Sequence, residues 1–180
     1  MGAPDEEEML TPILCLVGRS NTGKTTLIER LIPSLAAKGV TVATIKHHED
    51  PFEIDYEGKD TYRHKKAGAK TAMIVSSQRL AMVKDLERGL TIEEITAQYA
   101  GDVDLVIVEG YKAAALPKIE VYNYREDLVP VAAQDKDLVA LVTDAPISAS
   151  VPVFSREDIE GIATFIMRHF GLRGSRPPAG

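Results

Sequence analysis

The sequence is poor in the features that mark several classes of protein. It has one cysteine, Cys15, and no tryptophan among 180 residues, so no disulfide can form within the chain and a reducing compartment is expected. No apolar run approaches the ~20 residues that cross a membrane, and the acidic start differs from a signal peptide. The formal net charge of −6 gives no general attraction for nucleic acid or anionic lipid. We therefore expect a cytoplasmic protein without nucleic-acid or membrane partners.

The most informative stretch is Gly-Arg-Ser-Asn-Thr-Gly-Lys-Thr, residues 18–25, which fits the pattern G-x-x-x-x-G-K-[ST]. An apolar run over residues 13–17 precedes it and an amphipathic pattern over residues 24–38 follows it, as the strand and helix around a phosphate-binding loop require. The loop N–H groups and the helix start form an anion site. Lys24 adds positive charge for the phosphates, and the Thr25 hydroxyl can ligate Mg²⁺. The sequence therefore predicts a nucleoside triphosphate site.

Strand and helix patterns alternate along the rest of the chain. Strands are predicted at residues 40–47, 71–77, 79–86, 103–111, 117–123, 138–144 and 151–154, and helices at residues 59–69, 91–100 and 157–170. The second and third of these strands fit an antiparallel pair joined by a turn. The alternation predicts an α/β fold, a P-loop NTPase-like three-layer sandwich with a mainly parallel sheet and one antiparallel excursion. This nucleotide-binding domain is expected to span residues 12–171, because residues 1–11 are acidic and residues 172–180 are rich in glycine and proline, which predicts disordered tails.

Two carboxylates on the predicted strand Val-Asp-Leu-Val-Ile-Val-Glu are candidates to hold the metal. Asp104 lies near the start of that strand and Glu109 near its end. Ligands of open parallel sheets bind at the carboxyl ends of the strands, so this position favours Glu109 and disfavours Asp104. A carboxylate in an apolar run is also costly unless it has a partner. The alternative is that Glu109 makes an ordinary structural hydrogen bond.

Polar residues after the second predicted strand offer two further candidate sites. His47 and His48 invite a metal site, but adjacent strand residues point to opposite faces and no further cluster of histidine or cysteine joins them. We interpret this segment as a polar loop with one histidine near the phosphates. The lysine and arginine side chains of residues 59–66 form a basic cluster, which fits equally a second anionic ligand and the solvated face of a helix.

Asp144 ends a late predicted strand and is the candidate for recognising the base. Guanine presents its N1–H and its N2 amino group side by side, and one carboxylate can accept from both, whereas adenine does not present that pair. The sequence has no full Asn-Lys-x-Asp motif, so the alternative for Asp144 is an ordinary Asp-Ala-Pro turn.

Five stretches of the chain carry a family resemblance. They are GRSNTGKTTLIERLIPSLAAKGVTVATIKHH, FEIDYEGKDTYRHKKAGA, DLVIVEGYK, PKIEVYN, and LVALVTDAPI with VPVF, over residues 13–154. The combination of IKHH, D-x-x-GKD-x-x-R-x-x-x-AGA and VEGYK is specific, whereas the phosphate-binding loop alone is not. Together they resemble the molybdopterin-guanine dinucleotide biosynthesis protein B family. The resemblance implies a GTP-binding accessory or adaptor protein with weak hydrolysis, which acts beside the guanylyltransferase that joins GMP to molybdopterin.

Carried over by position, the resemblance also implies functions for individual residues. Asp60 and Glu109 match the family's acids near the metal, with Thr25, and Asp144 remains the candidate for guanine. The phosphates and Mg²⁺ are assigned to Gly18, Ser20, Asn21, Thr22, Gly23, Lys24, Thr25 and Thr26. The implied ligands are GTP and Mg²⁺. The implied partners are the molybdenum cofactor guanylyltransferase, molybdopterin as a further candidate, and a second copy of the chain in a homodimer.

Two basic residues are the candidates for catalysis. Lys24 would stabilise charge on the phosphates together with the loop N–H groups. We hypothesise that Arg19 reaches the partner's nucleotide when two chains meet, because an arginine directed at transition-state charge accelerates hydrolysis by about 10³–10⁵ in other systems. The alternative is that Arg19 is solvated. No glutamine or histidine is clearly placed to orient the attacking water, so slow GTP hydrolysis is expected.

Two other functions would use the same residues. A small-molecule kinase of this fold needs an acceptor pocket and a cationic lid, for which the basic cluster at residues 59–66 is the candidate. A binding module would use the nucleotide only to order a loop. Transfer of phosphate to an acceptor distinguishes the kinase from the accessory protein, and the hydrolysis rate distinguishes the binding module.

Overall fold

The structure, a computed structural model, describes residues 10–48, 50–123 and 129–174. The described residues form two compact units, one made of residues up to 47 and from 95 onward, the other of residues 48–94. Most of the two predicted disordered tails lies outside the described residues. The assignment of residues 12–171 to one nucleotide-binding domain stays a prediction, and no pattern in the sequence indicates the two units within it.

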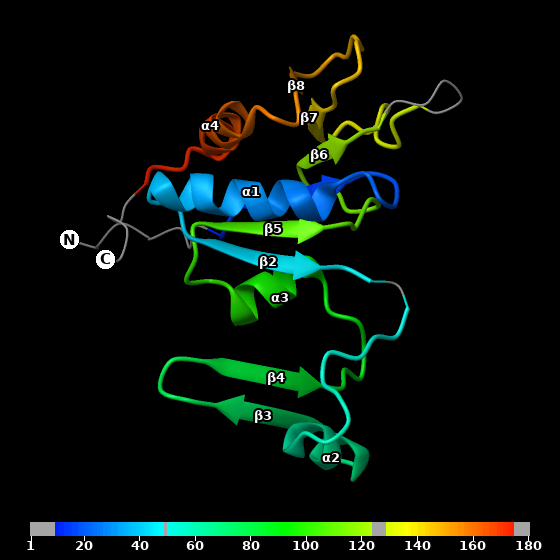
Figure 1. The fold of residues 1–180 in the computed structure, drawn as a ribbon, viewed down its shortest axis with the longest axis vertical. Coiled ribbons are helices and arrows are strands. Elements are labelled where there is room, and N and C mark those ends of the chain that lie inside the picture. The colour runs from blue at the N-terminus through cyan, green and yellow to red at the C-terminus, as the bar shows by residue number, and fades with distance from the viewer. Residues whose placement is uncertain (1–9, 49, 124–128, 175–180) are drawn as a thin grey trace, which may run out of the picture. The chain divides into compact units, whose positions relative to one another are not determined.

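The larger unit is built on one parallel sheet (Figure 1). Its strands are β1 (Ile13–Val17), β2 (Val42–Lys46), β5 (Leu105–Glu109), β6 (Lys118–Val121), β7 (Leu138–Val142) and β8 (Val153–Phe154). They lie in the order β2-β5-β1-β6-β7-β8, and every neighbouring pair is parallel. Because the strands run in one direction, the segments that follow them meet at one edge of the sheet, called here the carboxyl edge.

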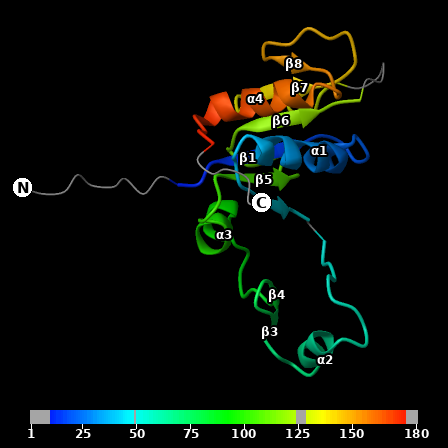
Figure 2. The same ribbon diagram turned by 60° about the vertical axis from the view of Figure 1, so that its left-hand side comes forward.

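The core of this unit forms where two helices, α1 (Lys24–Ala37) and α4 (Ile159–Phe170), pack with the sheet. The two helices lie beside each other (Figure 2). Every residue of β1 is buried, as expected for a central apolar strand. The helices contribute Leu27, Ile28, Leu31 and Leu35 from α1 and Ile162, Ala163 and Ile166 from α4. This packing holds both β1 and α1, and therefore both ends of the loop between them.

Local signals explain where these helices end. The Asp158 carboxylate accepts a hydrogen bond from the Gly161 N–H at 2.9 Å and caps the start of α4. Gly171 follows α4 with φ of 65°, and Gly39 follows the cap residue of α1, Lys38, with φ of 77°. Glycine adopts this left-handed backbone without strain, so it stops each helix.

The smaller unit contains the antiparallel excursion. β3 (Thr71–Val75) and β4 (Leu80–Lys84) pair antiparallel, and the Ser76 N–H donates to the Arg79 carbonyl at 2.8 Å across the turn. α2 (Asp60–Lys66) precedes β3, and α3 (Ile92–Tyr99) begins near the end of the unit. The predicted fold class, an α/β fold with a mainly parallel sheet and one antiparallel pair, is confirmed.

Candidate nucleotide-binding site

The loop between β1 and α1, residues 18–23, is called here the phosphate loop. Gly18, Asn21 and Gly23 have positive φ angles of 144°, 59° and 89°. A Cβ on Gly18 would lie 2.4 Å from the Val121 carbonyl oxygen, so only glycine fits against the end of β6. Residues of positive φ among ordinary ones turn N–H groups toward a common centre, which makes a concave anion site. α1 begins directly after Gly23, so the helix N-terminus belongs to the same site.

A cavity of about 370 Å³ lies at this loop. Its lining residues are Ser20, Asn21, Thr22, Gly23, Lys24, Thr25, Thr26, Lys46 and Glu109. Seven of the eight residues predicted to hold phosphate and Mg²⁺ therefore share one cavity, while Gly18 supports the turn behind them. The Lys24 ammonium donates to the carbonyl oxygens of Arg19, at 2.8 Å, and Gly18, at 3.4 Å.

The charges around Lys24 favour an anionic ligand. Burial lowers the pKa of the Lys24 ammonium, Glu109 acts in the opposite direction, and Lys112 and Lys46 lower it further by repulsion. An anion bound among these three lysines would relieve their repulsion and stabilise the charged form of Lys24. Triphosphate is an anion of this kind.

Thr25 and Glu109, two of the three predicted metal ligands, are in direct contact. The Thr25 hydroxyl lies 3.0 Å from Oε1 and 3.1 Å from Oε2 of Glu109. Glu109 is the last residue of β5, at the carboxyl edge, and its side chain is 15% exposed. Lys46 Nζ lies 3.8 Å from Glu109 Oε1. A hydroxyl and a carboxylate are oxygen ligands of the type that Mg²⁺ takes, so this pair fits the ion, and the metal role stays a prediction.

Asp104 lies at the other end of the same strand. Its carboxylate accepts from the N–H and the hydroxyl of Thr41, at 2.7 and 2.6 Å, and so links the starts of β5 and β2. Glu109 therefore lies in the cavity and Asp104 at the opposite edge of the sheet, as the direction of the strand predicted.

Asp60 and the two histidines have contacts outside the cavity at the phosphate loop. Asp60 begins α2 in the smaller unit, and its Oδ1 lies 3.7 Å from Arg63 Nη1, so its place in a Mg²⁺ site stays a prediction. The ring centroid of His47 lies 4.5 Å from that of Tyr111, and His48 Nδ1 contacts the backbone of Asp50. Within the described parts of the chain, no group of three or more histidine, cysteine, aspartate or glutamate side chains could hold a metal ion.

The basic cluster at residues 59–66 is partly engaged within the smaller unit. Lys65 Nζ lies 2.6 Å from the Asp85 carboxylate and 2.8 Å from the Ala69 carbonyl oxygen, and its side chain is 16% exposed. Lys66 Nζ lies 5.4 Å from the centroid of the Tyr62 ring. Lys65 therefore stabilises the junction between α2 and β3, a structural role that differs both from a second anionic site and from a solvated helix face.

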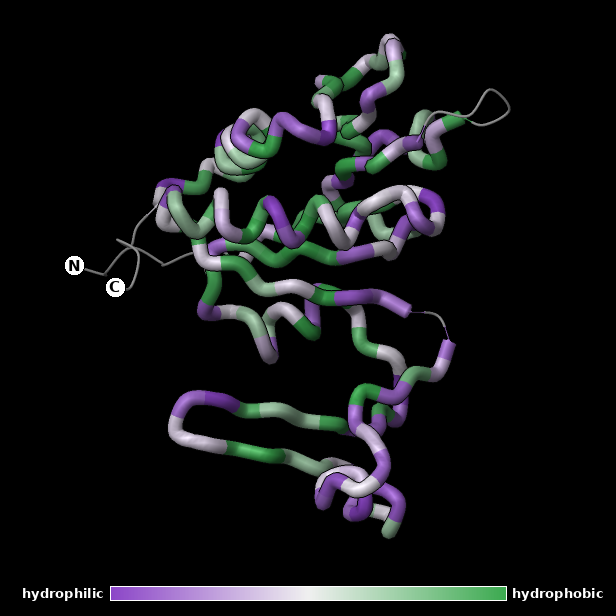
Figure 3. Tube along the Cα trace, in the orientation of Figure 1, coloured by the Kyte–Doolittle hydropathy of each residue, from purple (hydrophilic) through white to green (hydrophobic). Residues whose placement is uncertain are grey.

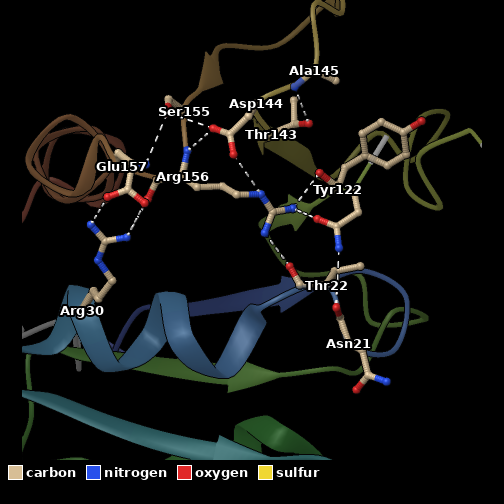
Figure 4. A network of polar contacts seen from close by, with 11 residues as sticks. Asn21, Thr22, Arg30, Tyr122, Thr143, Asp144, Ala145, Ser155, Arg156 and Glu157 are labelled. Atoms are coloured by element: carbon tan, nitrogen blue, oxygen red, sulfur yellow. Dashed lines mark hydrogen bonds and ion pairs between the residues drawn. The ribbon is translucent and has the colours of Figure 1, made fainter. Parts of the chain in front are cut away.

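Asp144, the candidate for guanine, follows β7 at the carboxyl edge (Figure 4). Its Oδ1 accepts from the Ser155 hydroxyl at 2.9 Å and from the Arg156 N–H at 3.1 Å, and its Oδ2 lies 3.4 Å from Arg156 Nε. The Arg156 N–H, the Ser155 hydroxyl and the guanidinium charge together lower the pKa of Asp144. The side chain is thus held as a carboxylate, and at 58% exposure it is open to a ligand. Guanine recognition by Asp144 stays a prediction.

Arg156 links three segments at this edge, and no local pattern in the sequence predicts it. Its Nη1 donates to the Thr22 carbonyl oxygen at 2.7 Å. Its Nη2 donates to the Tyr122 carbonyl oxygen at 2.8 Å and also contacts Asn123 Oδ1. The one available signal is its place two residues after the strand VPVF, where a parallel sheet positions ligand-binding side chains.

Two lysines near the phosphate loop were also not predicted. Lys46 ends β2 and lines the cavity, and Lys112 follows a strained turn in which Tyr111, a non-glycine residue, has φ of 60°. The signal was present in the sequence, because these lysines lie in IKHH and VEGYK, two of the stretches that carry the resemblance. Positive φ at a tyrosine costs free energy and is most often kept where function requires it.

Comparisons with known proteins identify the family. A family model described as "Molybdopterin guanine dinucleotide synthesis protein B" matches residues 13–144. The chain belongs to this family. A curated relative from Escherichia coli (strain K12), named molybdopterin-guanine dinucleotide biosynthesis adapter protein, is 32% identical over 165 residues, which cover 88% of this chain and 93% of the relative. A relative of the same name from Haemophilus influenzae is 33% identical over 163 residues, which cover 88% of this chain and 91% of the relative.

Solved structures from the molybdopterin guanine dinucleotide synthesis protein B family share the fold. The crystal structure of a molybdopterin-guanine biosynthesis protein B superposes with a TM-score of 0.72 at 31% identity, over 89% of this chain and 99% of that chain. A MobB homolog from Bacillus stearothermophilus superposes with a TM-score of 0.66 at 25% identity, over 88% and 97% of the two chains. The predicted P-loop NTPase-like fold is therefore confirmed. No helix in the described ranges is long and apolar enough to span a membrane.

Proposed function

We propose that this chain binds GTP with Mg²⁺ and acts as an adapter in molybdopterin-guanine dinucleotide biosynthesis. The observation that supports the proposal most is the grouping of three features at one carboxyl edge: the phosphate loop, the Thr25–Glu109 pair and the exposed carboxylate of Asp144. The names of the curated relatives support the pathway.

The phosphates would be bound by the loop N–H groups, the start of α1 and the ammonium of Lys24. Thr25 and Glu109 would hold Mg²⁺, with Asp60 as the further ligand that the resemblance implies. When bound, Mg²⁺ would neutralise charge on the phosphates and fix their geometry. Lys46 lies 3.8 Å from Glu109, and Lys46 and Lys112 both repel the ammonium of Lys24, so the site sets one carboxylate against three lysines.

Hydrolysis at this site is expected to be slow. The residues that line the cavity in the described part of the chain include no glutamine and no histidine, the side chains that most often orient an attacking water or take its proton. GTP would then serve mainly to order the site. We infer that the ordered surface is offered to a guanylyltransferase that joins GMP to molybdopterin, and that molybdopterin is a candidate for direct binding.

We also propose a homodimer, with β3 and β4 as the contact. Apolar residues run along both strands (Figure 3). The large apolar residues Met73, Ile74, Val75 and Leu80 are 58 to 73% exposed. A two-stranded sheet is marginally stable alone, and exposed apolar strands tend to be covered by another chain. A monomeric protein at micromolar concentration in analytical ultracentrifugation would contradict this assignment.

Titration calorimetry with Mg²⁺ tests the nucleotide assignment. The ligands are a non-hydrolysable GTP analogue and its ATP counterpart, and the proteins are the wild type and Asp144→Asn. We expect the wild type to prefer GTP and the variant to lose that preference, because an amide offers a donor where guanine also presents one. Equal binding of GTP and ATP by the wild type would count against GTP as the ligand. A separate incubation with labelled hydrolysable triphosphate and candidate acceptors tests the kinase alternative, and a phosphorylated acceptor in place of free phosphate would indicate a kinase.

A further inference from the structure

The guanidinium of Arg156 spans the space between the candidate base site and the phosphate loop (Figure 4). Its Nε faces Asp144 Oδ2 at 3.4 Å, and its Nη1 donates to the Thr22 carbonyl oxygen at 2.7 Å. Its Nη2 is held by the end of β6, through the Tyr122 carbonyl oxygen and the Asn123 side chain. The side chain of Arg156 is 25% exposed, so most of it is enclosed by these partners.

The contact with Thr22 fixes the orientation of one peptide group in the phosphate loop. In a trans peptide the carbonyl and the following N–H point in opposite directions. The Thr22 carbonyl faces Arg156, so the Gly23 N–H faces away from Arg156, and Gly23 lines the cavity. A Cβ on Gly23 would lie 3.1 Å from Arg156 Nη1, which shows how closely the guanidinium is packed against the loop.

A second contact acts on the preceding peptide group. Asn123 Nδ2 lies 3.5 Å from the carbonyl oxygen of Asn21, and Asn123 is itself in contact with Arg156. Asn21 has φ of 59°, in the left-handed region that asparagine adopts more readily than most other non-glycine residues. The end of β6 and Arg156 therefore hold two successive carbonyl groups of the phosphate loop.

We propose that Arg156 is a positioning residue that couples the phosphate site to the guanine site. It turns a loop N–H toward the phosphates and at the same time fixes the carboxylate of Asp144 for the base. This inference rests on the proposed GTP site, and it adds a residue that neither the phosphate-loop motif nor the candidate base ligand includes. Its consequence is that triphosphate affinity and guanine preference fall together when the guanidinium is removed.

The test measures binding of GTP, ATP and inorganic tripolyphosphate with Mg²⁺ by calorimetry. The variants are Arg156→Gln, which removes the charge and the fork of donors, and Arg156→Lys, which keeps the charge but donates from a single nitrogen. The matched control is Arg30→Gln. Arg30 binds the Glu157 carboxylate at 2.7 Å and the Arg156 carbonyl oxygen at 3.3 Å, so it anchors the same segment. Within the described residues its hydrogen bonds go to these two partners and not to Asp144 or Thr22.

We expect Arg156→Gln to weaken tripolyphosphate binding about tenfold or more, the loss typical of one charge-assisted hydrogen bond. The GTP-to-ATP affinity ratio should fall toward one in the same variant. Arg156→Lys should restore neither the tripolyphosphate affinity nor the GTP preference, because one ammonium cannot reach Thr22, Tyr122 and Asp144 together. Arg30→Gln should keep the wild-type ratio. In the double variant with Asp144→Asn, the ratio should fall no further than in either single variant.

Other results would overturn the coupling. A variant that loses tripolyphosphate affinity but keeps the GTP preference, or the reverse, would show that the two sites act separately. Full recovery by Arg156→Lys would show that charge alone matters. If the wild type itself lacks a GTP preference, the proposed guanine site fails, and that result is seen before any variant of Arg156 is made. Denaturant unfolding of each variant checks that it is folded under the binding conditions.

Discussion

The tightest steric constraint at the site is at Gly18, and a set of glycine-to-alanine variants can measure it. In the larger unit, Gly101, Gly171 and Gly18 differ in what an added methyl group would meet. A Cβ on Gly101 would lie 3.7 Å from the nearest backbone atom, an ordinary contact. A Cβ on Gly171 would meet nothing within 4 Å, but the backbone there has φ of 65°. At Gly18 the φ of 144° is combined with a distance of 2.4 Å to the Val121 carbonyl oxygen.

These differences give an expected order of stability. Gly101→Ala should be close to neutral. Gly171→Ala should lower the free energy of unfolding by about 1–2 kcal/mol, the cost of a left-handed backbone for a residue with a Cβ. Gly18→Ala should lower the free energy of unfolding by about 2–5 kcal/mol, because two costs add. The backbone conformation is one that only glycine adopts readily, and the added methyl group would overlap with the Val121 carbonyl oxygen of β6. The Val121 carbonyl cannot rotate away freely, since the N–H of the next residue, Tyr122, is bonded to β7.

Urea unfolding followed by circular dichroism gives the three free energies, and calorimetry with GTP and Mg²⁺ gives the functional effect. Gly18→Ala should also bind nucleotide more weakly than its loss of stability explains, because the phosphate loop must move to accept the methyl group. If Gly18→Ala is as stable as Gly171→Ala or more stable, then the loop does not pack tightly against β6, and this explanation of Gly18 is wrong.

Three further predictions concern charges at the site. Glu109→Gln should weaken triphosphate binding in the presence of Mg²⁺ about tenfold or more, and should have little effect on triphosphate binding in the absence of Mg²⁺. The matched control is Asp104→Asn, at the other end of β5, which should leave binding unchanged under both conditions. The folded protein lowers the pKa of Asp144, so its carboxylate stays charged until the pH falls below the ordinary range of an aspartate. The ratio of GTP to ATP affinity should therefore be the same at about pH 7 and about pH 5. A fall in this ratio between the two pH values would contradict the assignment of Asp144 to guanine. Arg19→Ala should slow turnover in the dimer, because the variant lacks the side chain proposed to act on the partner's nucleotide. Turnover unchanged from the wild type, in the dimer and in the partner complex alike, would show that Arg19 is a solvated side chain.

The features that were predicted correctly depend on neighbours in the chain. Thr91 and Glu94 form a capping box at the start of the helix predicted over residues 91–100, in which the Glu94 N–H lies 3.2 Å from Thr91 Oγ1 and the Thr91 N–H lies 2.9 Å from the Glu94 carboxylate. Arg88 and the Thr91 N–H lower the pKa of Glu94 to about 2. A motif of this kind uses residues three positions apart, so the sequence contains both partners and the geometry follows from the start of a helix. The phosphate loop was predictable for the same reason.

The contacts of Arg156 could not be predicted, because its partners are far away in the chain. Arg156 and Thr22 are 134 positions apart, and Arg156 and Tyr122 are 34 positions apart. Their contact depends on the strand order β1-β6-β7-β8, which places the segments after these strands side by side. Strand patterns predict that such segments share an edge, but not which side chain on that edge reaches across to the loop.

β6 shows a second limit of sequence patterns. Its residues Lys-Ile-Glu-Val alternate between polar and apolar, which is typical of a strand with one solvated face. All four are buried. Glu120 accepts from the N–H groups of Val131 and Ala132 at 2.7 and 2.8 Å, and Lys118 Nζ lies 3.0 Å from Asp135. The segment before β7 supplies these partners, so the polar side chains are satisfied inside the fold instead of in water.

The partners of four carboxylates distinguish the acids that hold the fold together from the candidate ligand-binding acids. Glu120 accepts from backbone N–H groups on both oxygens, and Asp104 accepts from the backbone N–H and hydroxyl of Thr41, so neither can change partners without moving the chain. Glu109 faces a threonine hydroxyl and a lysine, both of which can rotate away when a metal ion or a phosphate arrives.

Asp144 lies between these two cases. Its Oδ1 already accepts two donors, about the capacity of one carboxylate oxygen, whereas its Oδ2 faces only the side chain of Arg156 in the contacts described. A base that donates to both oxygens must therefore displace a donor from Oδ1, and the Ser155 hydroxyl is the one that can rotate, because the other donor is the backbone N–H of Arg156. Guanine recognition at Asp144 thus requires a change in one side chain and none in the backbone, which is compatible with a site held rigidly by Arg156.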